Sequence, residues 1–227
     1  MYSPWRLALV SGAIACIVAR AAISAVDVNR ANDYYANKGS NAVNVVELYH
    51  MSPCEKRLGE RAYARAMAEC GFILKIFPNH PTALLLTAQI CEEWKSPTCM
   101  LDDVFGRAIA INPKAPGTYV IEGIHLHRTG RYEQAIQKFQ KALELDANEM
   151  NAHYDIALTY LETKQFDLAN THAQRAYALG ATLPGLRERL TKAGYWKPTP
   201  QNAAPTPEAK APGSGRPAAP GESTGTR

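Results

Sequence analysis

The sequence predicts an all-α protein built as a solenoid, which is a row of stacked helical hairpins. Three observations support this fold class. Small and large apolar residues recur at helical spacing, the pattern repeats every 34 residues, and breaks fall near the middle and the end of each unit. A single hairpin of this kind cannot bury its apolar face, so we expect successive hairpins to stack on one another.

The internal repeat is most regular in the second half of the chain. When the sequence is shifted by 34 residues, Tyr132–Ala135 aligns with Phe166–Ala169, and Gly123 aligns with Ala157. We expect the small residue of the first helix, Gly123, to let Ala135 of the second helix approach closely. We expect the larger residues Leu126, Tyr132 and Phe139 to fill the space around that contact.

The repeat divides the chain into three full units and one degenerate unit. The degenerate unit ends at His80, where the matching positions are one residue out of register. The three full units are Thr82–Ala115, Pro116–Glu149 and Met150–Leu183. The units therefore predict about four helical hairpins in series.

The segment Arg128–Asn148, with the sequence RTGRYEQAIQKFQKALELDAN, resembles the tetratricopeptide repeat (TPR) at nearly every small and large position. The unit Met150–Leu183 resembles it nearly as well. The unit Thr82–Ala115 diverges, because Gln89 stands where a small residue is usual and Leu101 replaces the packing alanine. The resemblance implies a TPR solenoid of about three full and one degenerate helical hairpins plus a C-terminal capping helix. It also implies a protein-binding module whose partner is unknown.

The two ends of the repeat predict caps. In Pro184–Trp196, Leu186 and Leu190 share one face of an amphipathic helix, which suits a C-terminal cap. We expect residues 26–50 to form an N-terminal extension with one short helix, capped by Asn41. Residues 51–197 then form the solenoid and its capping helix. Residues 198–227 hold seven of the fifteen prolines and are expected to be a disordered tail.

The N-terminus predicts export. Leu7–Ala19 contains no charge but is shorter than the roughly twenty residues of a membrane-spanning helix, and it suits the core of a signal peptide. We assign residues 1–25 to a signal peptide or anchor and favour cleavage near Ala21–Ala25. An uncleaved anchor, or a lipoprotein acylated at Cys16, are the alternatives. The expected location is periplasmic or secreted, or membrane-anchored facing the periplasm.

The four cysteines beyond the leader predict two disulfides in an exported chain. Because Pro53 precedes an uninterrupted run, we expect one helix from about Cys54 to Phe77, antiparallel to a second helix over Thr82–Trp94. This arrangement favours nested Cys70–Cys91 and Cys54–Cys99 bonds. It excludes Cys54–Cys70, since sixteen helical residues span about 24 Å. A local Cys91–Cys99 bond remains an alternative.

In the TPR family the first helices of the hairpins line the concave surface. The resemblance therefore implies a partner-binding groove that is apolar along its floor and charged at its rim. The residues that the resemblance places in this groove are Leu86, Ile90, Trp94, Val120, Ile124, His127, Arg128, Tyr154, Leu158 and Leu161. The lysine and asparagine clamp by which some relatives grip a C-terminal carboxylate is absent. Alternatively, the apolar floor of the groove is covered by the same chain, either by the segment before Tyr49 or by the C-terminal tail.

The sequence contains no pattern typical of catalysis or of a cofactor. His125 and His127 lie about 200° apart on a helix, so they cannot share a metal ion, and no phosphate-binding loop is present. The formal net charge of +4 is too small for a nucleic-acid interface. We therefore expect a non-enzymatic scaffold that binds another protein or peptide. Membrane contact is expected only through the N-terminal segment.

Overall fold

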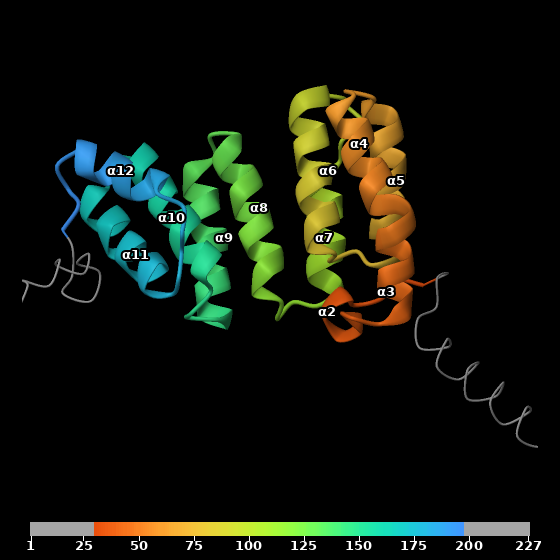
Figure 1. Ribbon diagram of the computed structural model, residues 1–227, viewed down its shortest axis with the longest axis horizontal. Helices are drawn as coiled ribbons and strands as arrows, with labels where there is room; N and C mark the ends of the chain where they lie inside the picture. Colours follow the sequence, from red (N-terminus) through yellow and green to blue (C-terminus); the bar gives the residue numbers. More distant parts are fainter. Residues whose placement is uncertain (1–29, 198–227) are drawn as a thin grey trace, which may run out of the picture.

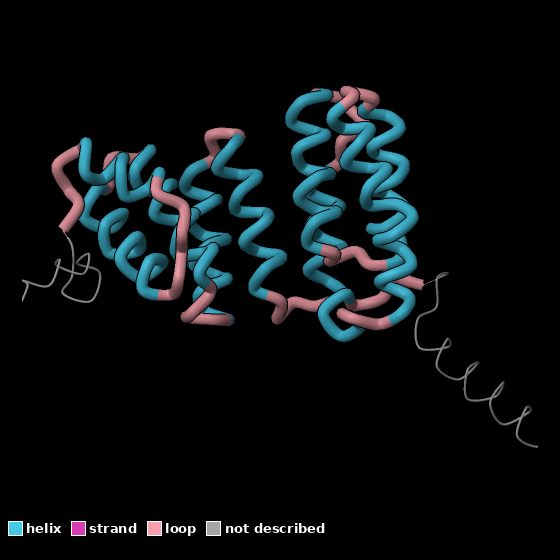
Figure 2. Tube along the Cα trace, in the orientation of Figure 1, coloured by secondary structure: helices cyan, strands magenta, loops and turns pink. Residues whose placement is uncertain are grey.

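Antiparallel helices follow one another through residues 30–197, the part of the chain that the computed structural model describes (Figure 1). Within this part every regular element is a helix and none is a strand (Figure 2). None of the helices described there is long and apolar enough to cross a membrane. The predictions for residues 1–25, including Cys16, and for the tail at 198–227 lie outside the described residues.

The helices are numbered along the chain as in Figure 1. They are α2 (Tyr34–Asn37), α3 (Asn41–Val46), the π-helical turn η1 (Glu47–Met51), α4 (Ser52–Gly59), α5 (Tyr63–Ile76), α6 (Pro81–Trp94), α7 (Leu101–Ile111), α8 (Pro116–Arg128), α9 (Tyr132–Leu145), α10 (Met150–Glu162), α11 (Phe166–Ala178) and α12 (Gly185–Lys192).

Four hairpins stack in series, and a final helix covers the last one. The hairpins are α4–α5, α6–α7, α8–α9 and α10–α11, and α12 packs on both helices of the fourth hairpin. The first helices α4, α6, α8, α10 and the cap α12 are neighbours in one continuous row. This arrangement confirms the predicted TPR solenoid of three full hairpins, one degenerate hairpin and a capping helix.

The predicted single helix from Cys54 to Phe77 is wrong. α3, η1 and α4 follow without a break as one helical rod from Asn41 to Gly59, after which the chain turns and returns as α5. The expected boundary between the N-terminal extension (residues 26–50) and the solenoid (residues 51–197) falls inside η1, within this continuous rod. The rod is capped by the Ser40 side chain, which accepts a hydrogen bond from the Val43 backbone, and not by Asn41 as predicted.

Backbone conformation at one residue explains why the helix ends at Gly59. Arg61 adopts φ = 55°, a left-handed conformation that terminates a right-handed helix. Gly130 (φ 76°) and Lys164 (φ 60°) occupy the same place in the third and fourth hairpins, two residues before the second helix begins. Pro53, taken from the sequence as the start of a helix, instead lies inside the rod as the second residue of α4. There the wider turn accommodates a residue without a backbone N–H.

The disulfides differ from the predicted pairs for the same reason. The turn at Arg61 brings α5 back against α4, so that Cys54 bonds to Cys70 across the hairpin with a Cα–Cα distance of 5.6 Å. The second bond is the local one, Cys91–Cys99, also with a Cα–Cα distance of 5.6 Å. The favoured nested pairing of Cys70 with Cys91 and Cys54 with Cys99 is therefore wrong.

The second hairpin is open at the end that carries the Cys91–Cys99 bond. Lys95 ends α6 with φ = 52°, in the same role as Arg61, Gly130 and Lys164. In the other three hairpins the second helix begins two residues after the left-handed residue, but here α7 begins only at Leu101. α7 therefore lacks its first turn, and α6 and α7 pack far less closely than α8 and α9.

The N-terminal segment that contains Asp33 and Tyr34, here called the strap, compensates for this open hairpin. The Asp33 carboxylate accepts hydrogen bonds from the side-chain amides of Asn79 (2.7 Å) and Asn112 (2.9 Å). Asn79 lies in the α5–α6 turn and Asn112 in the α7–α8 turn. The Tyr34 backbone N–H also donates to the Asn79 side-chain oxygen at 2.8 Å. The strap thus holds both ends of the α6–α7 hairpin to the N-terminal segment.

Close packing in the third hairpin depends on Gly123 and Phe139. A Cβ added to Gly123 would lie 2.5 Å from the Phe139 Cε1 atom, far inside van der Waals contact. Phe139 is fully buried, so its ring has no free space to move into. Gly123 therefore does permit a close approach of the second helix, and Phe139, one of the residues predicted to fill this space, is the side chain that lies against it.

We expect Gly123→Ala to destabilise the protein by about 1–3 kcal/mol, because the cost of overpacking exceeds the gain in helix propensity. Chemical denaturation followed by circular dichroism measures this change. The matched control is Gly106→Ala in α7, where an added Cβ meets nothing within 4 Å. The control is expected to stabilise the protein by up to about 1 kcal/mol. Equal effects of the two substitutions would contradict this account of the packing.

Candidate functional site

The ten residues predicted for the groove lie on the first helices of their hairpins, as expected, but most are covered by neighbouring helices. Ile90, Val120 and Leu161 are buried, with 0%, 5% and 7% of their surface exposed. Only Arg128 is exposed. The half-buried members of the set are Leu86, Trp94, Ile124, His127, Tyr154 and Leu158.

The predicted apolar stripe belongs to two separate packing clusters. Leu86, Ile90 and Trp94 pack with the Cys54–Cys70 bond and the first hairpin. The members on α8 and α10 pack in the core of the third and fourth hairpins. These side chains thus join each first helix to its neighbour in the row, and half of their surface or less remains for a partner.

Charged residues border the stripe on α8 and α10. The exposed Arg128 guanidinium lies 3.8 Å from the Glu92 carboxylate, and Glu162 forms an ion pair with Arg189 of α12 at 2.7 Å. His127 donates to or accepts from the Thr159 hydroxyl at 2.9 Å, and burial lowers the pKa of this histidine. The row of first helices therefore offers half-buried apolar side chains between charged ends.

Asp155 on α10 is a chemically unusual member of this row that sequence analysis missed. Burial raises the pKa of its carboxyl to about 7, against the effect of the Arg128 guanidinium, which lowers it. A carboxyl that titrates near neutral pH changes the charge of the surface beside it. The equivalent residue one unit earlier is Ile121, which is buried. Asp155 therefore stands at a position where the repeat uses a core residue.

A large cavity lies where α7 lacks its first turn. It has a volume of about 770 Å³ and opens between the end of α6, the start of α7 and the end of α8. A second hollow of about 560 Å³ lies on the other side of the same loop. Both hollows are lined by Cys91, Cys99, Met100, Leu101, Asp102 and Asp103.

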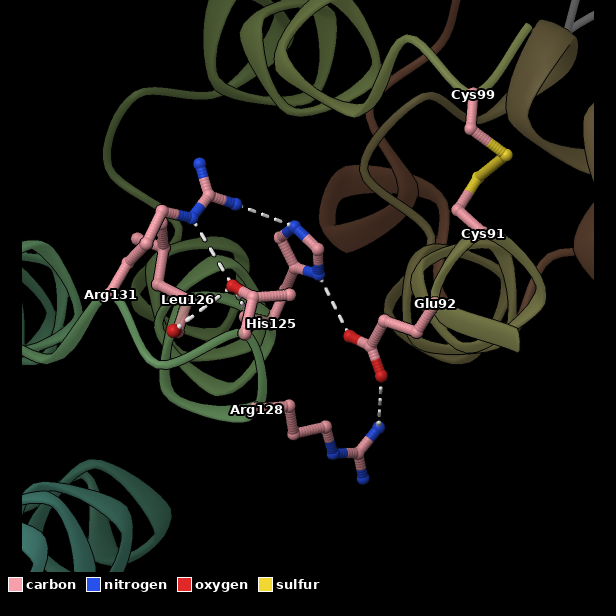
Figure 3. A network of polar contacts seen from close by, with 8 residues as sticks. Cys91, Glu92, Cys99, His125, Leu126, Arg128 and Arg131 are labelled. Carbon is pink, nitrogen blue, oxygen red and sulfur yellow. Dashed lines mark hydrogen bonds and ion pairs between the residues drawn. A yellow bond between two sulfur atoms is a disulfide. The ribbon is translucent and has the colours of Figure 1, made fainter. Parts of the chain in front are cut away.

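A polar network forms one wall of the larger cavity (Figure 3). His125 is nearly buried, with Nδ1 2.8 Å from the Glu92 carboxylate and Nε2 2.8 Å from the Arg131 guanidinium. Because the carboxylate only accepts and the guanidinium only donates, Nδ1 carries the proton and Nε2 accepts. The network ties the end of α6 to the end of α8 and so fixes the width of the cavity.

Two further histidines meet between α10 and α11. The Nδ1 atoms of His153 and His172 are 3.0 Å apart, and burial together with the neighbouring His153 lowers the pKa of His172 to about 4. Burial also lowers the pKa of His153. Within residues 30–197 no group of three or more histidine, cysteine or acidic side chains is arranged to hold a metal ion.

Sequence reasoning missed the cavity because the lengths of the turns within successive repeats were not compared. The length of the unit carried no signal, because Thr82–Ala115 has 34 residues like the units that follow it. The six-residue step from Lys95 to Leu101, against two residues at the equivalent turns, appears only in the structure. Comparison of the turns at Arg61, Gly130 and Lys164 would also have located the break in the first hairpin. The cavity thus follows from the late start of α7 in the second hairpin.

A family model described as a TPR repeat matches residues 125–164. Among curated proteins, the chain is 28% identical over 94 residues to a protein O-mannosyl-transferase, TMTC3, of Mus musculus, covering 41% of this chain and 10% of that protein. It is 33% identical over 70 residues to anaphase-promoting complex subunit 3 of Schizosaccharomyces pombe, covering 31% of this chain and 10% of that protein. The chain thus spans about a tenth of the length of these relatives.

Two solved structures share the fold. A Pseudomonas aeruginosa protein, PilF, superimposes with a TM-score of 0.54 at 17% identity, covering 68% of this chain and 70% of PilF. PilW, described as a type IV pilus biogenesis factor, superimposes with a TM-score of 0.52 at 22% identity, covering 68% of this chain and 71% of PilW. At these identities the likeness concerns the TPR solenoid itself.

We expect Asp155→Asn to stabilise the protein at pH 8 by on the order of 1–2 kcal/mol and to change little at pH 4. The folded-state pKa is raised, so the unfolded chain loses its proton first, and the cost of burying the charge grows as pH rises from about 4 to about 7. Denaturation midpoints at the two pH values measure the effect. Asp102→Asn, at an exposed site with no ion pair in the described residues, is the control. A stabilisation that is equal at both pH values would contradict the assignment.

Proposed function

We propose that the chain is a non-enzymatic interaction scaffold of the cell envelope, which binds a peptide or helix of a partner protein along its first helices. The observation that carries the proposal is the row formed by α6, α8 and α10. Half-buried apolar side chains lie along these helices, and exposed charged side chains lie at the helix ends. Such surfaces suit amphipathic partners, because apolar contacts provide affinity and charges provide register.

Export is supported by the chemistry of the cysteines. Disulfides persist in oxidising compartments and are rare in the cytosol of most organisms. All four cysteines in the described part are bonded in pairs. Together with the apolar leader in the sequence, this pattern favours a periplasmic or secreted scaffold.

A membrane-tethered structural subunit is the second candidate, and it is favoured by the cysteine in the leader. Mass spectrometry of the purified mature protein separates the two forms. An N-terminus at Ala22 or Val26 is expected for the soluble scaffold. A diacylated Cys16, or an intact leader, would establish the tethered form instead.

The binding surface is tested with a photo-crosslinking amino acid placed at position 124, in cells of the source organism. We expect a discrete crosslinked partner, and we expect Arg128→Glu to reduce its yield at least tenfold, because the substitution reverses the exposed charge beside Ile124. The matched control is Arg65→Glu on α5, an exposed arginine on a second helix. Circular dichroism shows that each variant is folded. Equal crosslinking by both charge variants would overturn the proposal.

A further inference from the structure

We infer that the Cys91–Cys99 bond is a site of thiol–disulfide exchange, which a dithiol reductant opens while the Cys54–Cys70 bond stays closed. We also infer that opening it lets α7 regain its missing first turn. The inference concerns the chemistry of the second hairpin, and it does not depend on the proposed binding surface.

The two disulfides differ in how well they are shielded. Cys54 and Cys70 are both 0% exposed and lie in a cluster with Leu58, Ala66 and Ile90. Cys91 is 7% exposed, and Cys99 is partly exposed. A thiol must reach a sulfur atom along the line of the S–S bond, so shielding decides which bond reacts.

The surroundings of the Cys91–Cys99 bond provide the required access. The hollows of about 770 Å³ and 560 Å³ lie on either side of the loop, and both cysteines line both of them. Figure 3 shows the bond running from the α6 ribbon to the Cys99 loop, beside the Glu92–His125–Arg131 network. Lys95 and Arg131 line the larger hollow and attract an anionic thiolate, whereas Asp102 and Asp103 line the same hollow with negative charge.

The exchange requires a reductant with two thiols. Its thiolate attacks the sulfur of Cys99, which is the more exposed of the pair, and the sulfur of Cys91 leaves as a thiolate. The second thiol of the reductant then attacks the mixed disulfide and releases the Cys99 thiolate. The reductant is oxidised to a disulfide by two electrons, and its two protons end on Cys91 and Cys99.

The loop before α7 contains residues that favour the start of a helix, but the disulfide prevents a helix from forming there. Ser96 lies directly after the left-handed Lys95, where the other hairpins place the N-cap of their second helix. Serine is a strong N-cap, and Pro97 would then occupy the first helical position, where proline is favoured. The Ser96 hydroxyl already accepts a hydrogen bond from the Thr98 backbone N–H at 3.3 Å.

The disulfide holds Cys99 at a Cα–Cα distance of 5.6 Å from Cys91, against the end of α6. Once it is cut, residues 97–100 are free to continue α7 toward Ser96. The second hairpin would then match the third, in which α9 begins two residues after Gly130. Closure of the hairpin narrows the cavity between α6, α7 and α8.

Selective reduction is tested on the whole protein with dithiothreitol as the dithiol. Samples are taken over time, alkylated with iodoacetamide and mapped by mass spectrometry. We expect Cys91 and Cys99 to be alkylated at least tenfold faster than Cys54 and Cys70. Equal rates, or earlier reaction of Cys54 and Cys70, would overturn the assignment.

The conformational step is tested by NMR on the selectively reduced protein and on the double variant Cys91→Ser/Cys99→Ser. We expect the Cα chemical shifts of residues 97–100 to move to helical values in both. The matched control adds Ser96→Ala, which removes the N-cap and is expected to abolish the shift. Unchanged shifts at residues 97–100 in the reduced wild-type protein would show that the hairpin does not close, and would overturn this part of the inference.

Discussion

The Asp33 carboxylate joins the N-terminal segment to both ends of the second hairpin. Asp33 receives hydrogen bonds from Asn79 and Asn112, which lie 46 and 79 residues further along the chain. These two asparagines stand in the turns that precede and follow the α6–α7 hairpin. Because that hairpin packs loosely within itself, its place in the row is set from outside by this junction. Asn79 is completely buried, so loss of the carboxylate would leave an unsatisfied amide in the core.

Periodicity predicted the architecture because each repeat carries the same arrangement of small and large residues. The third and fourth hairpins needed no correction in their bounds, and Gly123 was identified from its place in the repeat. Phe139 was among the residues predicted to fill the space beside it, but an alignment does not show which of those side chains lies against the glycine. The first hairpin was mistaken because Pro53 resembled a helix start and Arg61 did not resemble a turn. Left-handed backbone at an arginine is uncommon, so the residue type did not indicate a turn at this position.

The candidate site was predictable only in part. The family pattern placed ten residues on the first helices, but it did not show how deeply the neighbouring helices cover Ile90, Val120 and Leu161. Burial depends on how closely successive hairpins stack, which no single repeat encodes. The cavity beside Cys99 and the raised pKa of Asp155 arise where the chain departs from its own repeat. Such differences between repeats can be recognised once the regular units have been aligned, because the shared helical positions show where one unit differs from the others.

The positions of the disulfides divide the row into two mechanically different halves. Both bonds lie within the first two hairpins, whereas α8 to α12 are held by packing and by weak polar contacts. In a linear array each hairpin is supported only by its neighbours, so a pulling force is relieved at the least reinforced end. A load applied through the C-terminus would therefore peel away α12 and then the fourth hairpin before it reaches the two hairpins that contain a disulfide. The molecule would then unfold one hairpin at a time, starting from its C-terminal end.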